Sequence, residues 1–368
     1  MTRRLAAIAS VVTVWLVAII GFASPASAHS VSGVGATNWQ TTLTSLSPAP
    51  AGLTVKVVEN GSRLELTNRG PEIVVFGYEG EPYLRVGPKG VFINSRSPAA
   101  YLNCSRSGCT VPASADAHGE PRWEQFSAGQ TVLWHDHRIH WMGQSLPPDV
   151  ARDPGTRHVQ ARWTVTMAQG STVITAAGDY TWIPGTAAFP WLVVAAAFAA
   201  VALVVVPTRS WRWLAVAAGV VTAVDFAHAV AVAWSWAGGS VFRVTQLFEG
   251  SSYQMPGWIL GVLSVGLLFR GRPRGRQAAA CAGASALLFT GLLDFPVLSR
   301  SQAPFNGSLA VDRLSVAACL GLGLGVLVAA VVLIGVDRPR IEYDTDDTDA
   351  VADDDDVQAV AALAGGRG

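Results

Sequence analysis

Three of the chain's seven histidines fall within six positions, in the segment Trp134-His135-Asp136-His137-Arg138-Ile139-His140-Trp141. If this segment is a β-strand, His135 and His137 point to one face, because side chains alternate along a strand. Asp136 and His140 then point to the opposite face. Two imidazoles on one face, two residues apart, have a spacing that allows both to bind one transition metal ion.

A third ligand must come from elsewhere in the chain, and His29 is the candidate. Residues 1–28 have the form of a secretory signal peptide: two arginines, an apolar run and a final Ala-Ser-Ala. Cleavage after Ala28 would make His29 the first residue, whose amine and ring form a chelate. Such a nitrogen-rich set suits Cu(II), with zinc as the alternative, and Asp136 would ligate the metal or orient a histidine.

Both parts of this interpretation have an alternative. Residues 1–28 could be a retained membrane anchor, because the apolar run is nearly long enough to cross a bilayer. The Trp-, His- and Arg-rich segment could pack its rings against a membrane surface or a neighbouring element without binding metal.

A second group of ionisable residues lies in an apolar part of the chain. Asp225 and His228 are three residues apart, so a helix places them on one face. Ionisable groups inside a membrane are costly and point to function, here a relay. The alternative is a mutually satisfied pair that fixes helix packing. Asp294 and Asp312 each have an arginine nearby in the sequence and are expected to form ion pairs with it.

The composition predicts a membrane protein. Of the 368 residues, 50% are hydrophobic and 14% are charged, whereas soluble proteins have about 25% charged residues. The formal net charge of +0 argues against a basic nucleic-acid-binding protein. Five apolar runs are long enough, or nearly so, to cross a bilayer: residues 189–207, 213–236, 252–269, 278–298 and 314–336.

Arginines predict the orientation of these runs. They follow the first, third and fifth runs, so the corresponding loops face the cytoplasm. We therefore expect a multi-pass cell-membrane protein with an all-α domain of about five transmembrane helices over residues 186–337. The N-terminal domain is expected outside the cytoplasm. Residues 338–368 are expected to form an acidic, disordered cytoplasmic tail.

The sequence of residues 29–185 indicates an exported all-β sandwich of the immunoglobulin or cupredoxin kind. Alternating runs flank Asn60-Gly61, as in a β-hairpin, and several further short strands follow, one of them over residues 130–141. Cys104 and Cys109 favour a local disulfide over a thiolate metal site, because exported proteins meet an oxidising compartment.

The chain resembles the bacterial CopC-type copper-binding proteins in three features: export, a histidine directly after the cleavage site, and a β-sandwich that follows. Residues 159–167 and 178–182 are similar to the final hairpin of CopC domains. The resemblance implies periplasmic copper bound through an N-terminal histidine, a further histidine and an aspartate. Unlike CopC domains, this hairpin turns through Ala-Gln-Gly-Ser rather than an Asp-Gly-His element. The helical half resembles the CopD membrane partner in general character. The whole chain also resembles actinobacterial membrane proteins of copper-handling loci, in which an exported sandwich precedes several helices.

Three functions follow from these features. The first is a membrane-anchored extracytoplasmic protein that binds copper for storage, delivery or transport, with a periplasmic copper chaperone or a membrane protein as partner. The second is a metal-free scaffold or sensor that binds a membrane partner. The third is a metalloenzyme, against which the chain shows no separate acid–base group or nucleophile motif.

Overall fold

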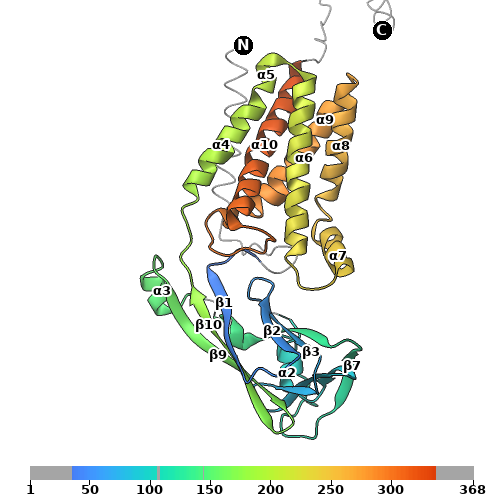
Figure 1. The fold of residues 1–368 in the computed structure, drawn as a ribbon. Helices are drawn as coiled ribbons and strands as arrows, with labels where there is room; N and C mark the ends of the chain where they lie inside the picture. The colour runs from blue at the N-terminus through green and yellow to red at the C-terminus, as the bar shows by residue number, and fades with distance from the viewer. Residues whose placement is uncertain (1–34, 106–107, 144, 337–368) are drawn as a thin grey trace, which may run out of the picture.

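The structure is a computed structural model that describes residues 35–105, 108–143 and 145–336. An N-terminal domain of ten β-strands precedes a C-terminal helical domain, and the two are stacked end to end (Figure 1). His29, the expected signal segment and the expected acidic tail lie outside the described residues.

The β domain consists of two antiparallel sheets. Its strands are β1 Trp39–Ser47, β2 Leu53–Val58, β3 Arg63–Asn68, β4 Ile73–Phe76, β5 Pro82–Gly87, β6 Gly90–Asn94, β7 Trp123–Ser127, β8 Thr131–His135, β9 His158–Gln169 and β10 Thr172–Trp182. One sheet has the order β1-β10-β9-β4-β5-β6-β7, and the other has the order β2-β3-β8. Three short helices interrupt the strands: α2 Pro98–Leu102, the 3₁₀-helix η1 His137–Ile139 and α3 Pro148–Arg152.

Alternating apolar side chains build the core of this domain. In β3, Leu64 and Leu66 are fully buried, and in β9 Val165 and Met167 are 1% exposed. These residues belong to one continuous apolar cluster, to which both sheets contribute side chains. Residues at every second position point to one side of a strand, so the alternation in the sequence is what allows the two sheets to share a core.

The predicted hairpin is present, but its turn is displaced by one residue. β2 and β3 pair from Leu53 opposite Asn68 to Val58 opposite Arg63. The amide of Gly61 donates to the carbonyl of Val58 at 3.2 Å, so Glu59 and Asn60 are the central turn residues, with φ of 53° and 56°. Gly61 follows with φ of 85°, and a turn with positive φ angles matches the twist of the paired strands.

The predicted strand over residues 130–141 was wrong beyond His135. β8 ends at His135, and Asp136 caps the 3₁₀-helix η1 by accepting a hydrogen bond from the amide of Arg138 at 3.1 Å. Aspartate often bonds to the backbone two residues on and so competes with strand pairing. Strand alternation therefore does not relate His137 and His140 to His135.

The helical domain comprises α4 Phe189–Leu203, α5 Val205–Thr208, α6 Trp211–Trp234, α7 Ser240–Gly250, α8 Met255–Phe269, α9 Arg274–Ser285, the π-helix η2 Ala286–Leu292, the 3₁₀-helix η3 Phe295–Leu298 and α10 Leu309–Val336. α10 lies against α4, α6, α9 and η2 (Figure 1). It is therefore the helix around which the bundle is built.

Three helical stretches of the described residues are long and apolar enough to cross a membrane: Phe189–Thr208, Trp211–Trp234 and Leu309–Val336. α7 and α8 would count as a fourth, broken span, because they meet at a bend of 83°. The expected run 252–269 forms α8, which has 15 residues. The expected run 278–298 is divided among α9, η2 and η3.

Glycines let α10 approach its neighbours closely. A Cβ on Gly321 would lie 2.0 Å from the carbonyl oxygen of Ala195 in α4. A Cβ on Gly323 would lie 2.9 Å from the carbonyl oxygen of Gly283 in α9. Apolar side chains have no hydrophobic drive to associate inside a membrane, so close backbone packing at small residues supplies much of the stability of such a bundle.

We predict that Gly321→Ala lowers the free energy of unfolding by about 1–3 kcal/mol, because the added methyl group overpacks the contact with α4. Gly335→Ala is the matched control on the same helix, since nothing lies within 4 Å of its Cβ position. It should leave stability unchanged or raise it by up to about 1 kcal/mol, as alanine favours helix over glycine. Thermal unfolding of the full chain in detergent checks both, and equal effects would contradict the packing argument.

Candidate functional site

His135 is turned toward β3, and both of its ring nitrogens have partners there. Its Nδ1 lies 3.0 Å from the carbonyl oxygen of Ser62, and Nε of Arg63 donates to its Nε2 at 3.1 Å. Both ring nitrogens of His135 are therefore engaged by the β2–β3 hairpin. Because β8 ends at His135 and His137 begins η1, the expected strand that would place both rings on one face does not extend to His137.

Asp136 anchors the β domain. Its side chain is fully buried and accepts hydrogen bonds from Nη2 of Arg138 at 2.7 Å and from Nε of Arg138 at 2.8 Å, one on each carboxylate oxygen. The indole of Trp134 donates to the same carboxylate at 2.9 Å. A two-pronged arginine–carboxylate pair holds η1 in place and leaves the carboxylate fully engaged within the protein.

His137 and His140 are the histidines that the fold brings together. Their ring centroids lie 5.5 Å apart at an interplanar angle of 69°. Within the described residues, Nε2 of His137 is buried and has no hydrogen-bond partner. The backbone amide of His137 donates to the hydroxyl of Tyr78 at 2.9 Å. Burial, helped by the charge of Asp136, raises the pKa of Tyr78 to about 12, so this phenol stays protonated.

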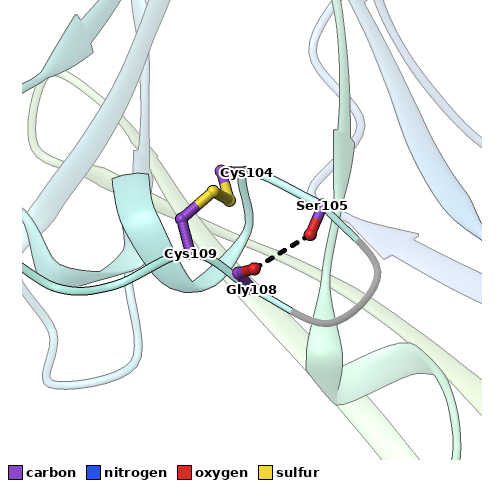
Figure 2. The surroundings of a disulfide bond; sticks show 4 residues. All are labelled: Cys104, Ser105, Gly108 and Cys109. Atoms are coloured by element: carbon purple, nitrogen blue, oxygen red, sulfur yellow. Dashed lines mark hydrogen bonds between the residues drawn. A yellow bond between two sulfur atoms is a disulfide. The ribbon is translucent and has the colours of Figure 1, made fainter.

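A disulfide loop lies beside these rings. Cys104 and Cys109 form a disulfide with Cα atoms 6.0 Å apart, and the hydroxyl of Ser105 donates to the carbonyl of Gly108 at 3.0 Å (Figure 2). A Cβ on Gly108 would lie 3.8 Å from Cε1 of His137. The loop therefore forms one side of the surroundings of His137.

The described residues contain no group of three His, Cys, Asp or Glu side chains arranged to hold a metal ion. The predicted set of His29, His135, His137, Asp136 and His140 is divided in the structure. His135 and Asp136 serve local contacts, His137 and His140 adjoin each other, and His29 lies outside the described range.

The helical domain holds a second group, centred on His228 of α6. Nε2 of His228 hydrogen-bonds with Oδ2 of Asp294 at 3.1 Å, and its Nδ1 lies 3.4 Å from Oδ1 of Asp312. The side chains of His228 and Asp312 are each 2% exposed, whereas that of Asp294 is 33% exposed. One imidazole thus lies between two carboxylates that come from different parts of the chain.

Asp225 extends this group one turn further along α6. The indole of Trp258 in α8 donates to its Oδ2 at 2.7 Å, and the hydroxyl of Thr290 in η2 donates to its Oδ1 at 2.5 Å. Gln254 donates to that hydroxyl at 2.9 Å. We call Asp225, His228, Asp294 and Asp312 the His228 cluster.

The sequence located half of this cluster and paired it wrongly. Asp225 and His228 share a helix face as expected, but within the described residues neither hydrogen-bonds to the other. Asp294 and Asp312 face His228 rather than arginines. The guanidinium of Arg313 donates instead to the carbonyls of Val297 at 3.2 Å and Arg300 at 2.7 Å. The sequence does show that Asp294 and Asp312 lie at the edges of apolar runs, which marks them as unusual. That both face His228 becomes visible only in the folded structure.

The His228 cluster has more acidic groups than basic groups. It combines three carboxylates with one imidazole, and among the described residues no Lys or Arg forms an ion pair with those carboxylates. Ionisable groups are costly in an apolar surrounding, so a group of this kind is a candidate functional site. An imidazole facing carboxylates from both ring nitrogens is suited to holding and passing a proton.

A further buried carboxylate lies where the two domains meet. The side chain of Glu59, at the tip of the β2–β3 hairpin, is 1% exposed and lies 3.3 Å from Nε of Arg63. Burial raises the pKa of Glu59, and the charge of Arg63 partly opposes this. Glu59 borders a cleft of about 690 Å³ between the small sheet and the loop from α6 to α7, which contains Trp236.

Comparison with known proteins gives no match to any family model, curated protein or solved structure. Function therefore has to be argued from the residues and geometry above.

We predict that Asp136→Ala lowers the free energy of unfolding by about 3 kcal/mol, the lower end of the range for breaking a buried ion pair, since Arg138 keeps 21% exposure. The matched control is Asp179→Ala, which breaks a 3.8 Å pair with Arg162 and should cost less than about 1 kcal/mol. Denaturant unfolding of the full chain, followed by tryptophan fluorescence, measures both. A small effect of Asp136→Ala would show that the carboxylate is no structural anchor.

Proposed function

We propose that this is a multi-pass membrane protein whose helical domain binds and transfers protons through the His228 cluster. The observation that carries the proposal is an almost fully buried imidazole placed between the carboxylates of Asp294 and Asp312, at 3.1 Å and 3.4 Å. Ionisable groups at such a place are costly and are kept where they serve a pathway or relay.

The chemistry of each group fits a relay. Asp294 is the most exposed member and can exchange protons with the outside. His228 can accept a proton on one ring nitrogen and release one from the other. Asp225, held by Trp258 and Thr290, offers the next carboxylate along α6.

The proposal includes a topology. We propose that α8 and the α9–η2 segment cross the membrane in addition to the three long apolar stretches, giving five crossings. The β domain, of the immunoglobulin or cupredoxin kind, then lies outside the cytoplasm and residues 338–368 lie inside. The arginines after α5, α8 and α10 support this orientation.

We predict that the full chain in liposomes increases the rate of proton entry under an imposed pH gradient and membrane potential. His228→Ala should reduce this rate to that of empty liposomes, because the imidazole is the only proton carrier between Asp294 and Asp312 among the described residues. Asp312→Asn should reduce it by about tenfold or more, the effect on the order of 1.4 kcal/mol expected when one charged partner is lost. A pH-sensitive dye inside the liposomes reports the rate.

The matched control for this experiment is His118→Ala, which removes an exposed histidine of the β domain. It should keep the wild-type rate. Proton entry that survives His228→Ala, or a wild-type rate equal to that of empty liposomes, would contradict the proposed function.

A second candidate function is copper binding by the β domain, for storage, delivery or transport. It is favoured by the contact of His137 with His140 and by the buried Nε2 of His137, which no hydrogen bond occupies within the described residues. His29, with its free amine after signal cleavage, would complete a nitrogen-rich set that suits Cu(II), with zinc as the alternative. The CopC resemblance supports this candidate, with a periplasmic copper chaperone or membrane protein as partner.

We predict for this candidate that the full chain retains copper after dialysis and that the double variant His137→Ala/His140→Ala loses it. His135→Ala is the informative control: it should retain copper, because its ring nitrogens already bond to Ser62 and Arg63. Metal analysis measures the bound copper, and N-terminal sequencing checks that the mature chain begins at His29.

Undiminished copper in the double variant would reject this assignment of ligands. An absence of bound copper and zinc in the wild-type chain would reject the metal-binding function and the metalloenzyme with it, and would favour the metal-free scaffold or sensor.

A further inference from the structure

We propose that residues 299–305, which we call the strap, couple the β domain to the His228 cluster and control proton access to His228. The strap follows η3 and leads to α10 (Figure 1). This inference rests on the proposed function, since it concerns the regulation of the same site. It follows from three sets of contacts made by this one segment.

The outer side of the strap is bonded to the start of β1. Thr37 and Gln302 exchange two backbone hydrogen bonds, each of 2.8 Å. The backbone amide of Ser301 donates to Oδ1 of Asn38 at 3.0 Å, and Asn38 is only 7% exposed. The strap thus continues the edge of the large sheet at this point.

The strap is also bonded to the chain that leaves β10. The hydroxyl of Ser301 donates to the carbonyl of Ile183 at 2.9 Å, and the amide of Thr186 donates to the carbonyl of Ser299 at 3.0 Å. A Cβ on Gly185 would lie 2.0 Å from the carbonyl oxygen of Ser299, so only glycine permits this approach. Both ends of the β domain therefore hold the strap.

The inner side of the strap lies on the cluster. The ring of Phe305 is 5.7 Å from the ring of His228, and the amide of the next residue, Asn306, donates to the carbonyl of Ala231 in α6 at 3.0 Å. Phe305 therefore covers one side of the imidazole with an apolar ring. Water and hydronium must pass this ring to reach His228 from that side.

The base of the strap is fixed to the bundle. Arg313 of α10 donates to the carbonyl of Val297, just before the strap, and to the carbonyl of Arg300 within it. The segment is thus anchored on α10, tied to β1 and β10, and ends over His228. A displacement of the β domain relative to the helices would pull on residues 301 and 302 and shift Phe305. Among the described residues, no hydrogen bond joins the β domain directly to the cluster.

The test removes the side-chain hydrogen bonds between the strap and the β domain and leaves the cluster residues unchanged. The variant Asn38→Ala/Ser301→Ala removes two hydrogen bonds to the strap. Both the wild-type and this tie-cut sequence are prepared with Phe305→Cys and Cys281→Ser. A water-soluble maleimide should then label residue 305 on the order of tenfold faster in the tie-cut chain, as the loss of two hydrogen bonds implies. Mass spectrometry localises and measures the label.

Thr44→Ala is the control for this labelling. It removes a hydrogen bond of 3.1 Å between β1 and the carbonyl of Ala177 in β10, away from the strap, and should leave the rate unchanged. Equal labelling in the tie-cut and control chains would overturn the coupling.

Proton entry supplies the second measurement. Phe305→Ala should raise the rate of proton entry into liposomes by uncovering His228, and the tie-cut variant should raise it in the same direction. If the wild-type chain conducts protons and neither variant changes the rate, the strap proposal is overturned and the proposed function stands. If the wild-type chain does not conduct, the proposed function fails, and the labelling alone decides whether the β domain holds the strap.

Discussion

The cost of charge in an apolar surrounding governs the organisation of the helical domain. His228, Asp225 and Asp312 are each 1–3% exposed, and a membrane interior offers them no water. Each needs a partner from another helix: Trp258 from α8, Thr290 from η2, and Asp312 itself from α10. The polar contacts therefore fix which helices must be neighbours, and the apolar surfaces around them complete the bundle.

The same requirement explains the unusual secondary structure beside the cluster. A regular α-helix would continue from α9, but the chain passes through the π-helix η2 before it reaches Asp294. π-Helical turns are rare and are frequent at functional sites, since they change the direction in which side chains project. Here Thr290 of η2 reaches Asp225, and Asp294, two residues after η2, reaches His228. The small residues of α10 then allow the neighbouring backbones to approach.

Periodic features of the chain were predictable from sequence, and features set by individual side-chain contacts were not. The hairpin at Asn60, the long strands β9 and β10 and three long apolar helices follow from local patterns that one segment contains by itself. The segment from His135 to His140 does not form a strand, because the carboxylate of Asp136 accepts hydrogen bonds from Arg138 and Trp134. The alternation of side chains along a strand does not reveal such contacts. Asp294 and Asp312 are separated from His228 by 66 residues or more. No local rule connects them, so their arginine neighbours in sequence were mistaken for their partners in space.

The central place of α10 has a consequence for how the molecule is made. Chains emerge from the ribosome N-terminus first, so the β domain and α6 are synthesised before α10, which supplies Asp312 and the glycine contacts to α4 and α9. Until α10 enters the bilayer, His228 lacks the carboxylate of Asp312. Biogenesis therefore passes through an incomplete bundle with a polar gap at its centre.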